Sequence, residues 1–366
     1  MIPMPKKKSL ASLELRAVVN ELQFLKGAKV DQIYHPEKEE LLIRFHVPNE
    51  GKKILRIIPG SLLNLTNEKK ETPVPSSFCL QLRKYLSNAT LETIDQQHSE
   101  RIVVMEFKKE ERYRLIVELF SKGNVVLVDR QENIIATLNQ QTWKDRTVKV
   151  REQYIFPEEG FHWQESTVED LQRTFQKSTM DSLVKSLAME MGLGGTYAEE
   201  ICVRVGLNKK TIPDKITTEE IKNIHREIRT LLQEATTPQG FVYETTVSPV
   251  RLQSFPTPSQ ILPTYNEAVD SVRPLEKTSP HQKRIRQLQF MIQEQEETMK
   301  ELEKEMAENT KKGELVYQHY PQLDQLLTIV QKLQRTSGWA AVEKELRMVK
   351  KIKHLDLKNK KITIEL

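Results

Sequence analysis

The spacing of apolar residues divides the chain into segments with different expected structure. Residues 10–25 carry apolar side chains at helical spacing, with Ser9 as the expected N-cap, and Gly27 closes this segment. A second helix is expected from Pro75 to Asn88. The rest of this region is β-type, with runs at 28–35, 40–47 and 52–59 and a four-strand meander at 102–107, 113–120, 125–129 and 134–138. The first part of the chain is therefore predicted to be a mixed α and β domain.

Two carboxylates interrupt the apolar face of the first helix. On a helical wheel, Glu14 and Glu21 fall inside the apolar arc rather than opposite it. An unpaired buried charge is costly, so such a carboxylate needs a cation or several hydrogen bonds. A position near the helix start is the other explanation, because the helix dipole favours acids there. Both explanations stay open for Glu14. For Glu21, the explanation that needs no special partner is favoured.

The stretch QQHSERIVVMEF, residues 96–107, places an acid and a base side by side at the start of an almost wholly apolar strand. These residues are Glu100 and Arg101. Successive side chains of a strand point to opposite faces, so the two cannot easily neutralise each other. Each therefore needs a partner elsewhere, and the pair is a candidate for a polar site.

From about residue 171 the pattern becomes helical. The stretch KSLAMEMGLGGTYAEEICVRVGL predicts two helices around Gly192, Gly194 and Gly195. Glycine allows backbone conformations closed to other residues, and the start of the second helix exposes N–H groups suited to a phosphate. This is how a helix-hairpin-helix module holds a nucleic-acid backbone. On spacing alone a plain turn is favoured.

The last third of the chain returns to β-type composition and then becomes strongly helical. Residues 238–265 are rich in Pro and Thr, which predicts a return to the first domain. Two later stretches, 285–306 and 323–349, carry apolar residues at coiled-coil spacing, and their order predicts an antiparallel helical hairpin. The predicted class is therefore α+β, with segments 1–172 (N-terminal domain), 173–236 (helix-hairpin-helix module), 237–275 (return segment) and 276–366 (coiled-coil arm).

Charge adds a candidate for nucleic-acid contact at the base of this arm. The net charge of +5 is the difference of 56 cations and 51 anions, so basic behaviour must come from local patches. The 366 residues are too many for one compact core, which fits two or three domains. A charge run is usually a solvated face, but this one is also a candidate for contact with phosphate: Lys344, Arg347, Lys350 and Lys351.

Several classes of function find no support in the sequence. Cys79 and Cys202 are the two cysteines, which disfavours a disulfide framework and points to a reducing, cytoplasmic setting. We read no signal peptide and no membrane span. Phosphate-loop, zinc-protease and nucleophile motifs are missing, and the eight histidines are scattered. We therefore expect no metal, no cofactor and no catalysis by this chain, and function more plausibly lies in binding.

Six stretches occur together in an order typical of one family: PSSFCLQLRKYL, SERIVVMEF, ELFSKGNVVLVD, GLGGTYAEEICVRVGL, YNEAVD and KGELVYQHY. Over nearly its whole length the chain resembles the NFACT family, the group of eukaryotic NEMF and bacterial RqcH, and its short arm fits an archaeal member. The resemblance implies an N-terminal domain like that of Fpg-type (MutM) glycosylases, a helix-hairpin-helix module and a coiled-coil arm. The small C-terminal RNA-binding domain of the family is missing, which fits a truncated chain or a split protein with that domain on a separate chain.

The resemblance implies a role in ribosome-associated quality control, and with it a ribosome contact for the basic cluster at the base of the arm. Such proteins bind a large ribosomal subunit obstructed by peptidyl-tRNA, recruit tRNA and support template-free, alanine-type tailing, while the ribosome performs the peptide chemistry. In the family, an Asp–Arg pair at the start of the strand that here begins at residue 102, together with an Asp on the first helix, is tied to tRNA handling. Here those positions are Glu100, Arg101 and Glu14. Glutamate is one methylene longer than aspartate, so the contact geometry is expected to shift, or the carboxylates to be structural.

The resulting hypothesis is that Glu14 and Glu100 hold Arg101 in a polar site that contacts tRNA. A guanidinium suits this role because its planar fork can grip a phosphate or stack on a base. Further candidates for the tRNA surface, each with an ordinary solvent-facing side chain as the alternative, are Arg83, Lys84, Lys122 and Asn124.

Two other functions stay open. The implied fold suggests a DNA glycosylase, but that type attacks with an N-terminal proline amine, and here Met1 and Ile2 precede Pro3. A coiled-coil scaffold or fibronectin-binding protein is the third interpretation, which the missing signal peptide disfavours. The coiled coil also allows self-association.

Overall fold

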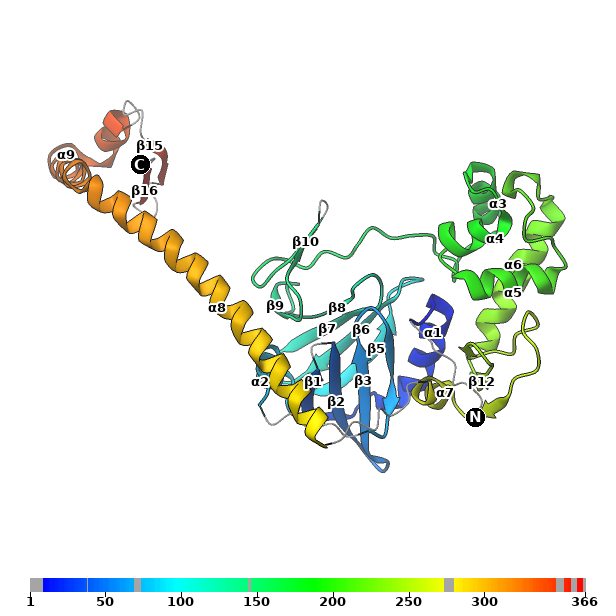
Figure 1. The fold of residues 1–366 in the computed structure, drawn as a ribbon. Coiled ribbons are helices and arrows are strands. Elements are labelled where there is room, and N and C mark those ends of the chain that lie inside the picture. Colours follow the sequence, from blue (N-terminus) through cyan, green and yellow to red (C-terminus); the bar gives the residue numbers. More distant parts are fainter. Residues whose placement is uncertain are drawn as a thin grey trace. The chain divides into compact units, whose positions relative to one another are not determined.

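The computed structural model describes residues 9–37, 39–68, 74–143, 146–272, 280–346, 352–356 and 361–364 (Figure 1). The chain divides into two compact units, Met1–Gln287 and Leu288–Leu366. The predicted boundaries after residues 172, 236 and 275 fall inside the first unit and stay predictions. Within the described part of the chain, no helix is long and apolar enough to cross a membrane.

A nine-stranded antiparallel sheet dominates the first unit (Figure 1). Its order is β4-β3-β2-β1-β5-β6-β7-β8-β9, so neighbours in sequence are mostly neighbours in the sheet. The strands are β1 (Lys29–Glu37), β2 (Glu40–Val47), β3 (Gly51–Ile58), β4 (Leu62–Thr66), β5 (Thr90–Gln96), β6 (Ile102–Lys108), β7 (Arg112–Glu118), β8 (Asn124–Val128) and β9 (Ile134–Thr137). The predicted α+β class and the predicted four-strand meander are confirmed.

Two strands of this sheet, β4 and β5, were not expected from the apolar pattern. Strand β4 is short, and its polar Asn64 lies among leucines. In β5 a register shift falls between Leu91 and Thr93, so the apolar residues Leu91 and Ile94 are three positions apart. This irregularity breaks the two-residue period that marks a strand in a sequence.

The two halves of the sheet enclose one core. Strands β1 and β5 pair through Lys29 and Thr90, so a short contact joins the halves. Across the core, the ring of Phe45 on β2 stacks on that of Phe107 on β6, with centroids 6.4 Å apart. Burial of this apolar interior is the main stabilising term for the unit.

Two turns also meet where the halves face each other. The amide of Gly60, after β3, donates to the carbonyl of Glu118 at the end of β7 over 3.1 Å. Gly60 and Gly123 both have positive φ, and a Cβ atom on either would meet backbone atoms of the other turn. Glycine at both positions therefore allows this approach.

The opposite face of β6–β9 carries a smaller apolar cluster. Ile102, Ile116 and Val126 project from the strands into it, and Val148 and Tyr154 cover them. Val148 belongs to a small hairpin made of β10 (Gln141–Thr142) and β11 (Thr147–Val148), which pair antiparallel.

Two helices pack on the sheet, and both are shorter than expected. Helix α1 (Ser12–Glu21) ends in a 3-10 turn, η1 (Leu22–Leu25), so the predicted segment 10–25 is not one continuous helix. Its N-cap is Ala11, and the prediction of Ser9 as N-cap is wrong. Helix α2 (Ser77–Leu86) is capped by Ser76, whose hydroxyl accepts a hydrogen bond from the amide of Cys79 over 3.1 Å.

A helical module follows the sheet domain. It contains α3 (Val168–Lys177), α4 (Leu183–Lys185), the π-helical turn η2 (Ser186–Glu190), α5 (Gly195–Val205), η3 (Pro213–Lys215) and α6 (Thr218–Glu234). Between η2 and α5, Gly192 and Gly194 have φ angles of 70° and 79°, which most other residues avoid. Helical segments thus flank these glycines, while the assignment of a helix-hairpin-helix module stays a prediction.

The chain then returns to the sheet domain. Strands β12 (Gly240–Val242), β13 (Val247–Ser248) and β14 (Gln260–Leu262) form a small sheet, and α7 (Tyr265–Ser271) contacts α1 and β4. The carboxylate of Glu21 accepts hydrogen bonds from the amides of Tyr265 and Asn266 over 2.7 and 2.8 Å. Burial raises the pKa of Glu21, and these hydrogen bonds oppose that shift. One acid on the apolar face of α1 therefore caps the start of α7.

The second unit differs from the predicted coiled-coil hairpin. Helix α8 (Pro280–Gln318) runs up to His319, and α9 (Tyr320–Leu346) starts directly after it, with a backbone interruption at Gly338. The apolar positions of α8 are exposed, while Val330 and Val342 of α9 pack on each other beside the hairpin of β15 (Ile352–Asp356) and β16 (Lys361–Ile364). In the described residues, α8 and α9 do not form the expected antiparallel pair.

The basic cluster predicted for ribosome contact falls partly on this unit. Lys344 is exposed on α9. Arg347, Lys350 and Lys351 lie outside the described residues.

Candidate functional site

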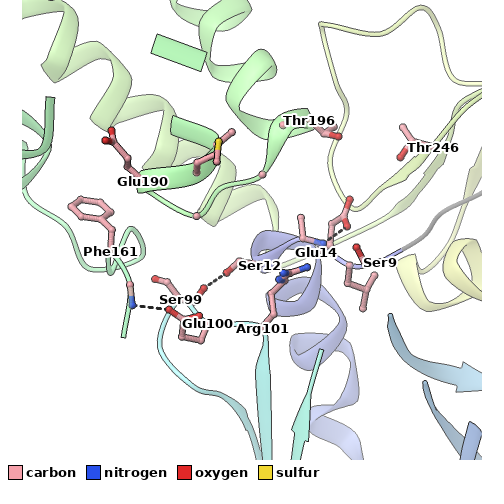
Figure 2. Close-up of a pocket in the computed structure, with 18 of the residues that line it drawn as sticks. Ser9, Ser12, Glu14, Ser99, Glu100, Arg101, Phe161, Glu190, Thr196 and Thr246 are labelled. Carbon is pink, nitrogen blue, oxygen red and sulfur yellow. Dashed lines mark hydrogen bonds between the residues drawn. The ribbon is translucent and has the colours of Figure 1, made fainter. Parts of the chain in front are cut away.

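A pocket of about 610 Å³ lies in the first unit (Figure 2). Its walls come from the start of α1, the β5–β6 turn, the segment before α3, the glycine segment before α5 and the turn after β12. It brings together six residues that the sequence singled out: Glu14, Glu100, Arg101, Gly192, Gly194 and Gly195.

Arg101 supplies the positive charge of the pocket. It directly precedes β6, and its carbonyl accepts a hydrogen bond from the amide of Leu119 over 2.8 Å, which fixes the backbone at the end of the sheet. In Figure 2 its side chain runs from the start of β6 toward the first turn of α1. Among the described residues, its guanidinium has no hydrogen-bond or ion-pair partner. The pocket thus contains a half-buried cation that forms no direct ion pair within the described protein.

The electrostatic surroundings of Arg101 follow from this position. Burial lowers the pKa of its guanidinium, and the nearby Glu100 carboxylate acts in the opposite direction. An arginine keeps its charge at neutral pH even with a lowered pKa. A ligand anion would therefore meet a permanent charge that has already lost part of its water.

Glu100 lies in the turn before β6, close to the start of the predicted strand. Its amide donates to the carbonyl of Gln97 over 2.9 Å, and His98 in this turn has a positive φ of 45°. The Oε1 atom of Glu100 accepts a hydrogen bond from the amide of Gly160 over 2.9 Å. Glu100 therefore anchors the segment before α3 against the β5–β6 turn.

A network of uncharged groups ties this turn to α1. The hydroxyl of Ser12 donates to the carbonyl of Ser99 over 2.5 Å. The side-chain Nε2 atom of Gln96 donates to the carbonyls of Ser12 and Glu100 over 3.1 and 2.9 Å. From the other side, the Nε2 atom of Gln164 donates to the carbonyl of His98 over 2.9 Å. These bonds hold the backbone just before Arg101 in place.

Glu14 is buried and engaged with two donors. Its Oε2 atom accepts from the amide of Ala11 over 2.7 Å, and its Oε1 atom accepts from the hydroxyl of Tyr197 on α5 over 3.0 Å. Burial raises the pKa of Tyr197, and the Glu14 charge adds to this, so the hydroxyl stays protonated and can donate. Neither Glu14 nor Glu100 is bonded to Arg101, which differs from the expected arrangement.

The reach of Glu14 explains why glutamate suits this position. We expect Glu14→Asp to keep one of the two hydrogen bonds and to lose the other, because its carboxylate is one methylene closer to the helix. The expected loss is about 1–3 kcal/mol of unfolding free energy, measured by urea denaturation. Glu220→Asp is the matched control, since Glu220 accepts from the amide of Thr217 at the start of α6 over 2.8 Å. Equal losses in both variants would contradict the bridging role.

The start of α5 forms another wall of the pocket. Gly194 is its N-cap and provides no side-chain cap, and the first helical bond runs from the amide of Ala198 to the carbonyl of Gly194 over 3.0 Å. Gly195 and Thr196, which line the pocket, precede this bond. Amides at a helix start point out of the helix, and the dipole favours negative charge there. This wall can therefore accept an anionic group.

Carboxylates outnumber cations in the pocket wall. Besides Glu14 and Glu100, Glu190 lines it, and its Oε2 atom accepts hydrogen bonds from the hydroxyls of Ser178 and Ser186 over 2.6 and 2.5 Å. The pocket wall therefore exerts little long-range electrostatic attraction on a polyanion. Binding must depend on specific contacts with individual side chains and backbone amides. Across the described residues, no cluster of His, Cys, Asp or Glu could hold a metal ion.

Comparison with known families identifies the chain. The family model for NFACT N-terminal and middle domains matches residues 12–366. The chain belongs to this family. This match confirms the resemblance to the NFACT family that was inferred from the six sequence stretches.

The relatives of this NFACT chain carry names from ribosome quality control. It is 28% identical to the archaeal Rqc2 homolog aRqcH of Methanocaldococcus jannaschii over 368 residues, which cover 93% of this chain and 54% of that protein. It is 35% identical to the human ribosome quality control complex subunit NEMF over 153 residues, which cover 40% of this chain and 14% of NEMF. The Rqc2 homolog RqcH of Bacillus subtilis is 27% identical over 208 residues, covering 51% of this chain and 36% of that protein. The chain thus spans about half the length of its archaeal relative.

Solved structures support the fold of the NFACT chain. The N-terminal part of the fibronectin/fibrinogen-binding protein of Streptococcus suis matches with a TM-score of 0.59 and 22% identity, covering 72% of this chain and 98% of that one. The fibrinogen binding protein of Staphylococcus aureus matches with a TM-score of 0.60 and 21% identity, covering 71% and 97%. MutM (Fpg) of Thermus thermophilus reaches a TM-score of 0.35, so the glycosylase-like architecture stays a prediction.

The other residues predicted to contact tRNA lie outside the pocket lining. Arg83 on α2 donates from Nε and Nη2 to the carbonyl of Ile33 over 2.8 and 2.6 Å, so it holds α2 on β1. Asn124 is fully buried, and its amide group donates to the carbonyl of Asn139 over 2.8 Å. The ammonium of Lys84 lies 5.2 Å from the ring centroid of Tyr85, and Lys122 is exposed in the β7–β8 turn. Arg83 and Asn124 both use their polar groups inside the fold, which disfavours a tRNA contact at these two residues.

Sequence reasoning also missed several residues of the site. Ser12 and Gln96 adjoin the residues that were singled out, so their neighbourhood is a usable signal. Gln164 and Thr246 are far away in sequence from Arg101, and no local pattern distinguishes them from other polar residues. They reach the site only because the chain returns to it.

Proposed function

We propose that this NFACT chain is an RNA-binding factor of ribosome-associated quality control. In this proposal it binds a large ribosomal subunit obstructed by peptidyl-tRNA, holds a tRNA in the pocket and supports template-free, alanine-type tailing of the stalled chain. Family membership and the names of the archaeal, bacterial and human relatives support the general role. The pocket supports the tRNA contact.

The observation that carries the proposal is the unpaired guanidinium of Arg101 in the pocket. This half-buried cation has lost hydration and gained no hydrogen bond or direct ion pair in the described protein. A phosphate oxygen or the face of a base can supply that partner, and a planar guanidinium fits both. The bonds around Ser12, Gln96 and Ser99 fix the backbone beside Arg101, so little order is lost when a ligand binds.

The other walls suggest how one nucleotide would lie in the pocket. The start of α5 at Gly195 and Thr196 offers amides to a phosphate on the wall formed by the glycine segment. Carboxylate oxygens of Glu100 and Glu190 can accept from ribose hydroxyls or from amino groups on base edges. Phe161 offers an aromatic face in the same pocket. These groups read shape and hydrogen bonds, which suits a specific RNA contact.

Tailing needs no catalytic group from this chain in the proposal. The ribosome forms each peptide bond, and the chain contributes by placing a tRNA. Exposed Lys344 and the other basic residues of the same cluster remain candidates for the subunit contact, and a separate C-terminal NFACT chain is a candidate partner.

The first test is co-sedimentation of the full chain with purified large subunits that carry peptidyl-tRNA, with bound tRNA followed across a salt series. We expect the chain to pellet with these subunits and to retain added tRNA, with binding that weakens as salt rises. Large subunits without peptidyl-tRNA are the control. A chain that neither pellets with obstructed subunits nor binds tRNA at low salt would overturn the proposal.

A further inference from the structure

A second aromatic and basic surface lies outside the pocket, on the small hairpin after β9. Trp143 follows β10 and is 42% exposed, which is unusual for a large aromatic side chain. The guanidinium carbon of Arg146 lies 4.5 Å from the centroid of the Trp143 ring, so one face of the indole is covered by a cation. The exposed part of the indole is open to solvent.

Buried groups hold this arginine, and through it the tryptophan, in position. The Nη1 atom of Arg146 donates to the Oε1 atom of Glu118 over 2.8 Å, and the hydroxyl of Tyr154 donates to the same oxygen over 2.8 Å. Glu118 is 1% exposed, so this ion pair is shielded from water. The backbone of the hairpin closes the arrangement, because the amide of Trp143 donates to the carbonyl of Arg146 over 2.9 Å. The indole is therefore presented as a fixed platform.

Unpaired cations accompany the platform. Lys122 lies two residues after Phe120, whose ring centroid is 5.8 Å from the guanidinium carbon of Arg146. Lys149 directly follows β11, and Arg151 lies two residues further on. All three are exposed, and in the described part of the chain none has an ion-pair partner. An aromatic platform with exposed cations on the segments that adjoin it matches the flexible, negatively charged backbone and stacked bases of single-stranded nucleic acid.

The residues that anchor the platform and the pocket lie at the same end of the sheet. Ile102 pairs with Glu118, and the amide of Leu119 donates to the carbonyl of Arg101. Arg101 therefore directly precedes Ile102, whose partner across the strands is Glu118, the residue that binds Arg146. Arg101 belongs to the face that meets α1, while Glu118 and Ile102 project to the opposite face. A path from the pocket to the platform therefore runs around the end of β6 and does not cross the sheet.

We propose that Trp143 stacks on an unpaired base of the tRNA held in the pocket, with Lys122, Lys149 and Arg151 contacting the neighbouring phosphates. This inference rests on the proposed tRNA binding and adds a second contact to it. The free cations favour RNA over an apolar protein segment, because burying three unpaired charges in a protein contact would cost desolvation energy.

The test measures binding of the full chain to tRNA with three variants. We expect Trp143→Ala to weaken binding about tenfold, and Trp143→Phe to weaken it less, because a phenyl ring still stacks. Tyr317→Ala, which removes an aromatic side chain that is 83% exposed on α8, is the matched control and should bind as the wild type. Urea denaturation of each variant checks that the fold is unchanged.

Tryptophan fluorescence gives an independent readout. The chain has three tryptophans, and Trp163 is buried, with 1% of its surface exposed. We expect tRNA to protect the wild type from acrylamide quenching, and this protection to vanish in Trp143→Phe.

The outcomes separate this inference from the proposed function. If the wild type binds tRNA, Arg101→Ala impairs it and Trp143→Ala does not, the pocket stands and the platform proposal is overturned. If Trp143→Ala loses subunit binding but keeps free tRNA binding, the platform faces the subunit and the proposal is again wrong. If the wild type binds no tRNA, both fail.

Discussion

Arg101→Ala should weaken tRNA binding by about 10- to 100-fold, the equivalent of one charge-assisted hydrogen bond of about 1.5–3 kcal/mol. The loss follows because Arg101 is the cation of the pocket and has no partner in the described protein, so its contact with RNA is not shared with an internal ion pair. Removing one phosphate contact should also lower the slope of log affinity against log salt by about one. Stability should change little, because no described internal bond is broken.

Two further variants sharpen this measurement. Arg101→Lys keeps the charge but loses the planar fork, so we expect binding between that of the wild type and that of Arg101→Ala. Arg226→Ala removes an exposed arginine on α6 that does not line the pocket and should bind as the wild type. If Arg101→Ala and Arg226→Ala had the same affinity, the effect of Arg101 would be one of net charge alone and the pocket contact would be refuted.

Glu200→Ala should lower the unfolding free energy by about 3–5 kcal/mol, because it leaves the largely buried Arg204 without one of its partners. Glu200 is fully buried on α5, and its carboxylate accepts hydrogen bonds from the amides of Gln253 and Ser254 over 2.9 Å each, and from the Nε atom of Arg204 over 2.7 Å. These bonds fasten the return segment to the helix whose start lines the pocket. Urea denaturation followed by circular dichroism measures the loss.

The neighbouring residue provides the control for this variant. Glu199→Ala removes an exposed carboxylate whose Oε1 atom lies 2.7 Å from the Lys209 ammonium, so we expect a loss below about 1 kcal/mol. If both alanine variants were equally stable, the carboxylate of Glu200 would not hold the return segment.

Glu200 also gives stability a dependence on pH. Burial raises its pKa, but hydrogen bonds from Gln253, Arg204 and Ser254 outweigh this, so the pKa lies below its ordinary value of 4.5. A carboxyl with a lowered pKa stabilises the fold above 4.5, and this contribution is lost as pH falls through the lower, folded-state value. Glu200→Gln should therefore lose less stability than the wild type between neutral pH and acid below 4.5. Parallel curves would contradict this assignment.

Local sequence determined much of the first unit. The meander from β6 to β9 follows from short apolar runs separated by polar turns, and α2 follows from its apolar face and the Ser76 cap. The same reasoning singled out Glu14, Glu100 and Arg101, because charged groups among apolar neighbours need partners. Each of these signals lies within a few residues of the structure it predicts.

Tertiary structure decided how the candidate site is built. The sequence predicted that Glu14 and Glu100 would hold Arg101, yet the acids bond to Tyr197 and Gly160, which come from distant segments. Within the described protein, Arg101 is left without an ion pair because donors from distant segments occupy the two carboxylates. A local sequence pattern cannot show this competition for the carboxylates. The meeting of the glycine segment with the β5–β6 turn likewise depends on the return of the chain.

The second unit shows the same division. Its sequence correctly predicted long helices, because helical periodicity is a local property. The predicted pairing of these helices was wrong for the described residues, since apolar spacing defines a face and does not name the partner that covers it. What a chain's sequence determines by itself is which local structure each segment prefers and where charge interrupts an apolar face. Which segments meet is decided by the burial and hydrogen bonding of the whole fold, as the joining of Glu14, Arg101 and the start of α5 in one pocket shows.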